Sequence, residues 1–162
     1  MSEISKNMCS VFGIAHVVSC CEIIFLDGFY YNSNFRDRNS QAEAGEVYQL
    51  VEFGSDLFRI LAAYDRQVSM VFSADMAHTH ASDGPYGYSP AAKIYDDSVQ
   101  DMFRENNFSR SIEIPESVVI EGKPDSFWNL LIMLGFLQAG GIRMHMEYYY
   151  VEHYFGMLFA HS

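Results

Sequence analysis

The stretch VSMVFSADMAHTHASDGPYGYSPAAK, residues 68–93, contains the transition that decides the fold. Its first part, Val68 to Ala74, is short, apolar and partly β-branched, which is typical of a buried strand. Polar residues and the glycine and proline breakers of DGPYG follow, and they predict a loop. Ser89 and Pro90 then predict a helix start, with serine as the N-cap and proline at the first helical position. Strand, loop and helix in this order indicate an α/β protein.

Hydrophobic spacing on either side predicts the other elements. From residue 42, apolar residues recur at intervals of three, four and seven and predict an amphipathic helix of about 20 residues. The helix that starts at Pro90 should reach about Asn106 and bury Ile94, Val99, Met102 and Phe103. A further helix should begin at Pro124-Asp125-Ser126 and end at Gly140-Gly141. The aromatic C-terminal region predicts two strands joined near Glu152-His153.

The N-terminal region is less regular. Residues 1–41 form an unassigned segment with two strand-like stretches, Val11–Val18 and Glu22–Leu26, and a polar loop. Residues 42–162 carry the readable fold. No apolar run reaches the roughly 18 residues that a membrane span needs, so we expect no membrane partner.

Composition excludes one class of partner. The formal charge is −11, with only 10 Lys and Arg, and the basic residues form no dense cluster, so nucleic acid is excluded as an expected partner. The length of 162 residues favours one domain. The 3 cysteines are an odd number without CxxC spacing, which favours a reducing, cytoplasmic location.

Titratable side chains gather where the predicted strand ends. Asp75, His78 and His80 follow it directly, and ligands of open α/β sheets collect beyond the carboxyl ends of strands. Imidazole titrates near neutral pH and binds metal ions. The residues alone leave two interpretations open: an acid/base or metal site, or loop histidines that hydrogen-bond to the backbone.

Three separated blocks carry a family resemblance: VEFGSDLFRILAAYDRQVSMVFSADMAHTHASDGPYGYSPAAKIYDD, then KPDSFWNLLIMLGFL, then YYYVEHYFGMLFA. In this order they resemble the C-terminal half of the catalytic subunits of class III extradiol ring-cleavage dioxygenases. The resemblance covers about Val47 to Ala160. The family pattern has a helix with EFG, a strand ending in S-[AG]-D-x-x-H, a DGPYG loop, a helix with an acidic residue and a final YFGM-like strand, and each feature occurs here.

The resemblance implies a fold and a chemistry. The expected fold is a truncated version of the family's α/β fold, with helices layered on a mixed central sheet. The expected reaction is cleavage of a catecholic ring with O2 by non-haem Fe(II). By position, His78 matches the acid/base histidine and Asp125 lies near the carboxylate ligand, where ring-cleaving members carry Glu. His80, Asp83 and Tyr86 are the expected substrate contacts.

Alternatives remain at these positions. Asp125 is also explained as a helix N-terminal acid stabilised by the macrodipole, and His80 either lines the pocket or supports the loop. The family's two iron-binding histidines belong to its N-terminal half, and no equivalent is recognisable here. His16 either mimics such a ligand or is a core histidine. The remaining histidines are expected at edges or on the surface: His145, His153 and His161.

Three functional hypotheses follow. The first is a dioxygenase fragment that needs a partner to supply two histidines, and the second is a non-catalytic relative that acts in binding or assembly. The third, an unrelated α/β hydrolase, is disfavoured because the sequence has no G-x-S-x-G motif. Under the first two, exposed apolar surface should drive formation of a homo-oligomer or pairing with a complementary subunit.

Two structural expectations test the assignment. The strand Val68–Ala74 should lie inside the sheet, with the loop Asp75 to Tyr88 at its C-terminal edge. His78 and Asp125 should face each other within roughly 10 Å, which is close enough to act around one metal ion.

Overall fold

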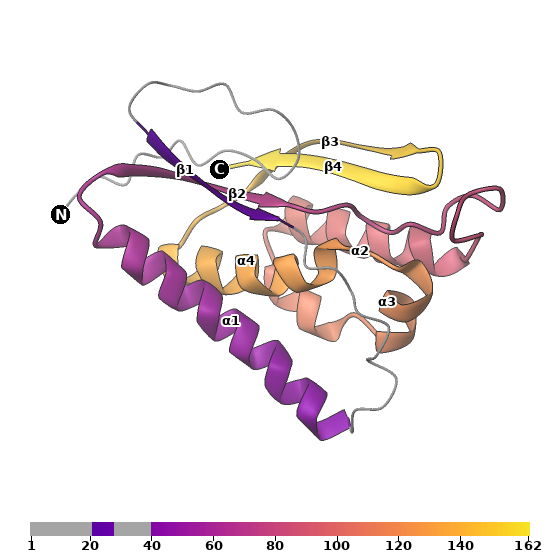
Figure 1. The fold of residues 1–162 in the computed structure, drawn as a ribbon, viewed down its shortest axis with the longest axis horizontal. Coiled ribbons are helices and arrows are strands. Elements are labelled where there is room, and N and C mark those ends of the chain that lie inside the picture. The colour runs from indigo at the N-terminus through magenta and orange to yellow at the C-terminus, as the bar shows by residue number, and fades with distance from the viewer. Residues whose placement is uncertain (1–20, 28–39) are drawn as a thin grey trace.

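The structure is a computed structural model that describes residues 21–27 and 40–162 (Figure 1). His16 and the expected strand Val11–Val18 lie outside these residues. Helices and strands are mixed along the chain, which confirms an α/β protein. The elements are β1 (Cys21–Asp27), α1 (Ser40–Ala62), β2 (Gln67–Ser73), α2 (Pro90–Glu105), the short 3-10 helix η2 (Phe108–Glu113), α3 (Glu116–Gly122), α4 (Ser126–Gly140), β3 (His145–Glu152) and β4 (Phe155–His161).

Helix α4 forms the centre of the molecule. Figure 1 shows the strands along one side of the molecule, with α4 between β2 and α1. Nearly every residue from Ser126 to Leu137 is buried, so α4 is enclosed on all sides. The start after Asp125 and the end at Gly140-Gly141 are confirmed, with Gly141 as a left-handed C-cap. This central position holds the first turn of α4 beside the end of β2.

Helices α1 and α4 touch backbone to backbone at two glycines. A Cβ at Gly54 would collide with the Ile132 carbonyl of α4, and a Cβ at Gly135 would collide with the Val51 carbonyl of α1. Ser55 strengthens the crossing, because its hydroxyl donates a hydrogen bond of 3.1 Å to the Gly135 carbonyl. Glycine is therefore required at these two positions because the helix backbones are in direct contact, and not because of an unusual backbone conformation.

Replacing Gly135 by alanine should lower the free energy of unfolding by about 3 kcal/mol or more, because neither backbone can retreat from the added methyl group. Gly122→Ala is the matched control, since a Cβ there meets no atom closer than 3.4 Å. Urea unfolding followed by circular dichroism measures both variants. Equal midpoints for the two variants would show that the helices do not cross as closely as described.

The strands form two pairs. β1 and β2 are parallel, and β3 and β4 are antiparallel around a turn at His153-Tyr154. Strand β1 contains the expected strand Glu22–Leu26, and the hairpin lies where the aromatic region predicted it. Backbone hydrogen bonds then join the segment after β2 to β4: the amide of Met76 donates to the Gly156 carbonyl (3.0 Å), and the amide of Gly156 donates to the Ala77 carbonyl (3.0 Å).

Two expectations about the strands and helices need correction. Among the described strands, β2 pairs with β1 alone, so the strand Val68–Ala74 is not seen inside a single mixed sheet. The reason is that β4 pairs with the residues after Ser73 rather than with β2 itself. The apolar pattern also did not indicate η2 and α3, which are only 6 and 7 residues long. Elements this short contain too few turns for a periodic apolar pattern.

Helix α2 confirms its predicted N-cap and most of its core. The Ser89 side chain accepts a hydrogen bond from the Ala91 amide, and the helix buries Val99, Met102 and Phe103. Ile94 was expected in the core, but it is 52% exposed. Asp96 lies two positions later, on the opposite side of a helix that turns about 100° per residue. Because the Asp96 carboxylate is hydrogen-bonded inside the protein, Ile94 faces out.

In the described ranges, 21–27 and 40–162, no helix combines the length and the apolar character needed to cross a bilayer.

Candidate metal centre

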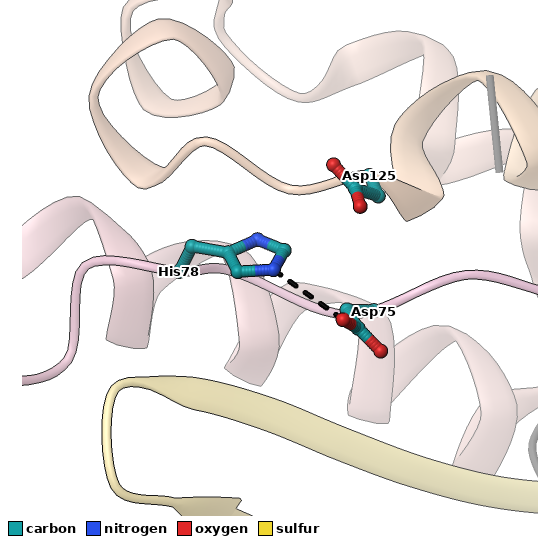
Figure 2. Close-up of side chains that lie close together, drawn as sticks. All are labelled: Asp75, His78 and Asp125. Carbon is teal, nitrogen blue, oxygen red and sulfur yellow. Dashed lines mark ion pairs between the residues drawn. The ribbon is translucent and has the colours of Figure 1, made fainter. Parts of the chain in front are cut away.

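Three titratable side chains gather where β2 ends and α4 begins. Asp75 and His78 follow β2, and Asp125 directly precedes α4 (Figure 2). One potential metal-ligating atom from each residue lies within 4.8 Å of the others. The expected proximity of His78 and Asp125 is therefore confirmed, and Asp75 joins them as a second carboxylate.

Backbone hydrogen bonds bring these residues together. The Ser126 amide donates to the Asp75 carbonyl at 3.0 Å, which fixes Asp75 beside the start of α4. Three residues later, the His78 amide donates to the Gly122 carbonyl at 2.8 Å. The segment from Asp75 to His78 thus runs along residues 122–126, with the carboxylates of Asp75 and Asp125 close together.

Asp125 occupies the N-cap position of α4 without acting as a cap. An aspartate at this position usually accepts a hydrogen bond from an amide of the first helical turn. The Asp125 side chain makes no such bond, and its carboxylate instead lies near Asp75 and His78 (Figure 2). Asp125 therefore makes no capping hydrogen bond, whereas stabilisation of its charge by the macrodipole of α4 requires none.

The backbone fixes the tautomer of His78. Its ring lies almost entirely inside the protein, and Nδ1 lies 2.8 Å from the carbonyl oxygen of Lys123. A carbonyl oxygen only accepts hydrogen bonds, so Nδ1 carries a hydrogen atom. Nε2 lies 3.4 Å from Oδ2 of Asp75, on the side of the cluster. In its neutral form His78 therefore presents the Nε2 lone pair to the carboxylates, ready to take a proton or bind a metal ion.

The surroundings of His78 raise its pKa. Burial alone lowers the pKa of the imidazole, but the hydrogen bond with Asp75, the carbonyl of Lys123 and the charges of Asp125 and Asp75 together outweigh it. The net result is a pKa above the ordinary histidine value. His78 consequently holds a proton over a wider pH range than a free imidazole, and any bound cation must compete with that proton.

Aromatic rings surround His78. The Tyr86 ring meets the imidazole edge-on with centroids 5.6 Å apart, and the Phe155 ring stacks at 5.9 Å. Tyr154 lies at 6.0 Å, and the ammonium group of Lys123 is 5.4 Å from the centre of the Tyr86 ring. Of the expected substrate contacts, Tyr86 is thus the one beside the cluster. These rings, packed at steep angles to one another, form an aromatic boundary next to an otherwise charged site.

His80 and Asp83 lie away from the cluster. His80 Nε2 is 2.8 Å from Oδ2 of Asp96, so this ring faces a different carboxylate and supports the loop. Asp83 is on the surface, 3.3 Å from Nε2 of His153. In the structure both side chains have protein partners, Asp96 for His80 and His153 for Asp83. Their roles as substrate contacts remain predictions.

The histidines of the hairpin lie at its surface, as expected. His145 and His153 are exposed. His161 is partly exposed and sits 2.7 Å from Glu147 across the strand pair. This hydrogen bond with Glu147 is the main reason that the pKa of His161 is raised. None of these histidines is in the Asp75, His78 and Asp125 cluster.

Comparisons with known proteins place most of this chain in a family. The family model described as the catalytic LigB subunit of aromatic ring-opening dioxygenase matches residues 40–160. A curated relative, Protein CA_C1420 of Clostridium acetobutylicum, is 24% identical over 91 residues, which is 56% of this chain. The match covers 19% of that relative, so this chain spans about a fifth of its length. Because the family model covers most of the chain, including all three residues of the cluster, the chain belongs to the family of catalytic LigB subunits of aromatic ring-opening dioxygenases.

Proposed function

We propose that this chain carries part of the active site of a non-haem Fe(II) extradiol dioxygenase that opens catecholic rings with O2. The observation that carries the proposal is the convergence of Asp75, His78 and Asp125 inside the region that matches the family model. Imidazole and carboxylate together are the donor types of non-haem Fe(II) oxygenase sites. The proposed cofactor is Fe(II), and the proposed substrates are a catecholic small molecule and O2.

The donor set fits a divalent metal ion. Two ligand atoms bound to one ion at about 2.1 Å are at most about 4.2 Å apart. Three ligand atoms on one ion are closer still, about 3.0 Å apart at bond angles of 90° and about 3.6 Å apart at 120°. Donor atoms within 4.8 Å of one another would therefore need to approach by up to about 1–2 Å. Asp125 is the proposed ligand. A site with two histidines and one carboxylate needs further imidazoles, and in the described part of the chain only His78 belongs to the cluster. We propose that a partner subunit or residues outside the described ranges supply them.

The roles of the protein groups follow from their contacts. Bound Fe(II) would supply adjacent coordination positions for a catecholate and O2. Nε2 of His78 is the proposed acceptor of a proton from the catechol hydroxyl. The Asp75 carboxylate would stabilise the resulting imidazolium, while the Lys123 carbonyl holds the opposite nitrogen. Tyr86 and Phe155 would flank the planar ring and exclude water.

A binding or assembly role is the second candidate. It is favoured by the single histidine in the cluster and by large apolar side chains on the surface. These side chains fit a chain that forms a homo-oligomer or pairs with a complementary subunit. Several of them lie on α1 and on the hairpin: Tyr48, Phe53, Ile60, Tyr148 and Tyr150.

An oxygen-isotope experiment separates the two functions. The chain, with any subunit that copurifies, is loaded anaerobically with Fe(II) and mixed with catechols under ¹⁸O₂. The dioxygenase proposal predicts a ring-opened product that contains both labelled oxygen atoms, together with O2 uptake that requires iron. Iron bound in stoichiometric amount without ring opening would reject the enzyme and leave the binding role.

A further inference from the structure

A buried carboxylate outside the cluster links the elements that form it. Asp96 of α2 is 0% exposed. Its Oδ1 accepts a hydrogen bond from the Ala77 amide at 2.9 Å. Its Oδ2 accepts from the Tyr149 hydroxyl at 2.6 Å and lies 2.8 Å from Nε2 of His80. Burying a carboxylate is costly unless its oxygens are satisfied, and here both oxygens have partners.

The Ala77 contact falls in the middle of the segment that carries Asp75 and His78. Ala77 lies between Asp75 and His78 in sequence, and its amide is held by the Asp96 side chain. The neighbouring amides donate to main-chain carbonyls, in the pairs Met76 with Gly156, His78 with Gly122 and His80 with Tyr154. Asp96 thus contributes a side-chain anchor to a segment that is otherwise fixed by backbone contacts.

The same carboxylate holds the hairpin against this segment. Tyr149 belongs to β3, and its hydroxyl donates a hydrogen bond to the Asp96 carboxylate of α2. On β4, a Cβ at Gly156 would collide with Oδ2 of Asp96, so glycine allows the hairpin backbone to lie directly on the carboxylate. Just before Gly156, Tyr154 in the turn and Phe155 at the start of β4 flank His78. Asp96 therefore contacts both the backbone under His78 and the hairpin whose rings surround it.

We infer that Asp96 is a positioning residue of this centre. Its carboxylate fixes the segment from Asp75 to His78, and through Tyr149 it fixes the aromatic boundary of the site. The functional purpose of this positioning rests on the proposed function. The positioning itself is a structural property of the chain and can be tested without activity. A positioning carboxylate must act locally: its loss loosens these amides beyond what the loss of overall stability explains.

Hydrogen exchange of the metal-free chain tests the inference. In Asp96→Ala, the amides of Ala77, His78 and Gly156 should exchange about tenfold or more faster than in the wild type, after correction for the change in global unfolding. Val99→Ala is the matched control, because it truncates another buried residue of the same helix. It should leave the corrected rates within about twofold. Asp96→Asn retains an acceptor for the Ala77 amide and should restore part of that amide's protection.

The outcomes separate this inference from the proposed function. Unchanged corrected rates in Asp96→Ala, or equal acceleration in Val99→Ala, would overturn the inference. If Asp96→Ala does not fold, Tyr149→Phe replaces it as the test, because this variant removes one hydrogen bond and keeps the carboxylate. The amide of Gly156 should then exchange faster than in the wild type. An unchanged rate at Gly156 would overturn the inference. A Mn²⁺ titration of each variant adds a second readout, with an expected affinity loss of about tenfold for Asp96→Ala. A wild-type chain that binds no Mn²⁺ even together with any subunit that copurifies would count against the proposed function and leave the exchange result standing.

Discussion

Replacing His78 by glutamine is expected to lower ring-opening turnover by about 10²- to 10⁴-fold, which is the usual contribution of a positioned acid/base group. Glutamine keeps a polar side chain of similar length but cannot take up a proton. Because Asp125 is the proposed ligand and His78 the proton-transfer group, the iron content should remain close to that of the wild type. Turnover and iron are measured on the same anaerobically loaded sample.

His161→Gln provides the control for this result. His161 is also bonded to an acid, Glu147, but it lies outside the cluster, and its replacement should leave turnover unchanged. Loss of iron from His78→Gln would make His78 a metal ligand and contradict the acid/base assignment. Full turnover in His78→Gln would remove the residue from the mechanism altogether.

Replacing Asp125 by asparagine should weaken Mn²⁺ binding by about 100-fold or more. The change removes one of the two carboxylates that face His78, and a neutral amide oxygen is a far weaker ligand than a carboxylate. Isothermal titration with Mn²⁺ measures the affinity. The metal-free variant should remain folded, because the Asp125 side chain does not cap α4.

Asp83→Asn is the matched control for the charge. It removes the same charge from an exposed position in the loop after β2, where Asp83 pairs with His153. Its effect on Mn²⁺ affinity should be small, because solvent and salt screen an exposed charge that is not a ligand. Equal losses in the two variants would mean that the chain attracts cations through its net charge of −11 rather than at a defined site.

The sequence predicted the elements whose local signals are strong. Helix α1 has a long periodic apolar pattern, and α2 has a serine cap followed by proline, so both were located from the residues alone. The end of α4 followed from its paired glycines. By contrast, the neighbours of β2 in the sheet are residues distant in sequence. The apolar pattern of a strand does not identify its pairing partners.

The candidate site was predictable only in part. The family resemblance selected His78 and Asp125, and their convergence followed from the fold. The partners of Asp75 and Asp96 depend on tertiary contacts. An acid beside Tyr95 on an amphipathic helix is normally assigned to solvent, and Asp96 is buried only because Ala77, His80 and Tyr149 satisfy its carboxylate. The prediction that Ile94 is buried was wrong for the same reason, because Asp96 occupies the buried face of α2.

Paramagnetic broadening by Mn²⁺ is the decisive measurement, because it locates the metal on the chain without requiring turnover. Two-dimensional amide spectra are recorded at a small fraction of one equivalent of Mn²⁺. We expect the amide signals of Asp75, His78, Asp125 and Ser126 to disappear first, and to persist at the same Mn²⁺ concentration in Asp125→Asn. Broadening that begins instead around Glu147 and His161, or that spreads evenly over the exposed acids, would contradict a metal centre at Asp75, His78 and Asp125.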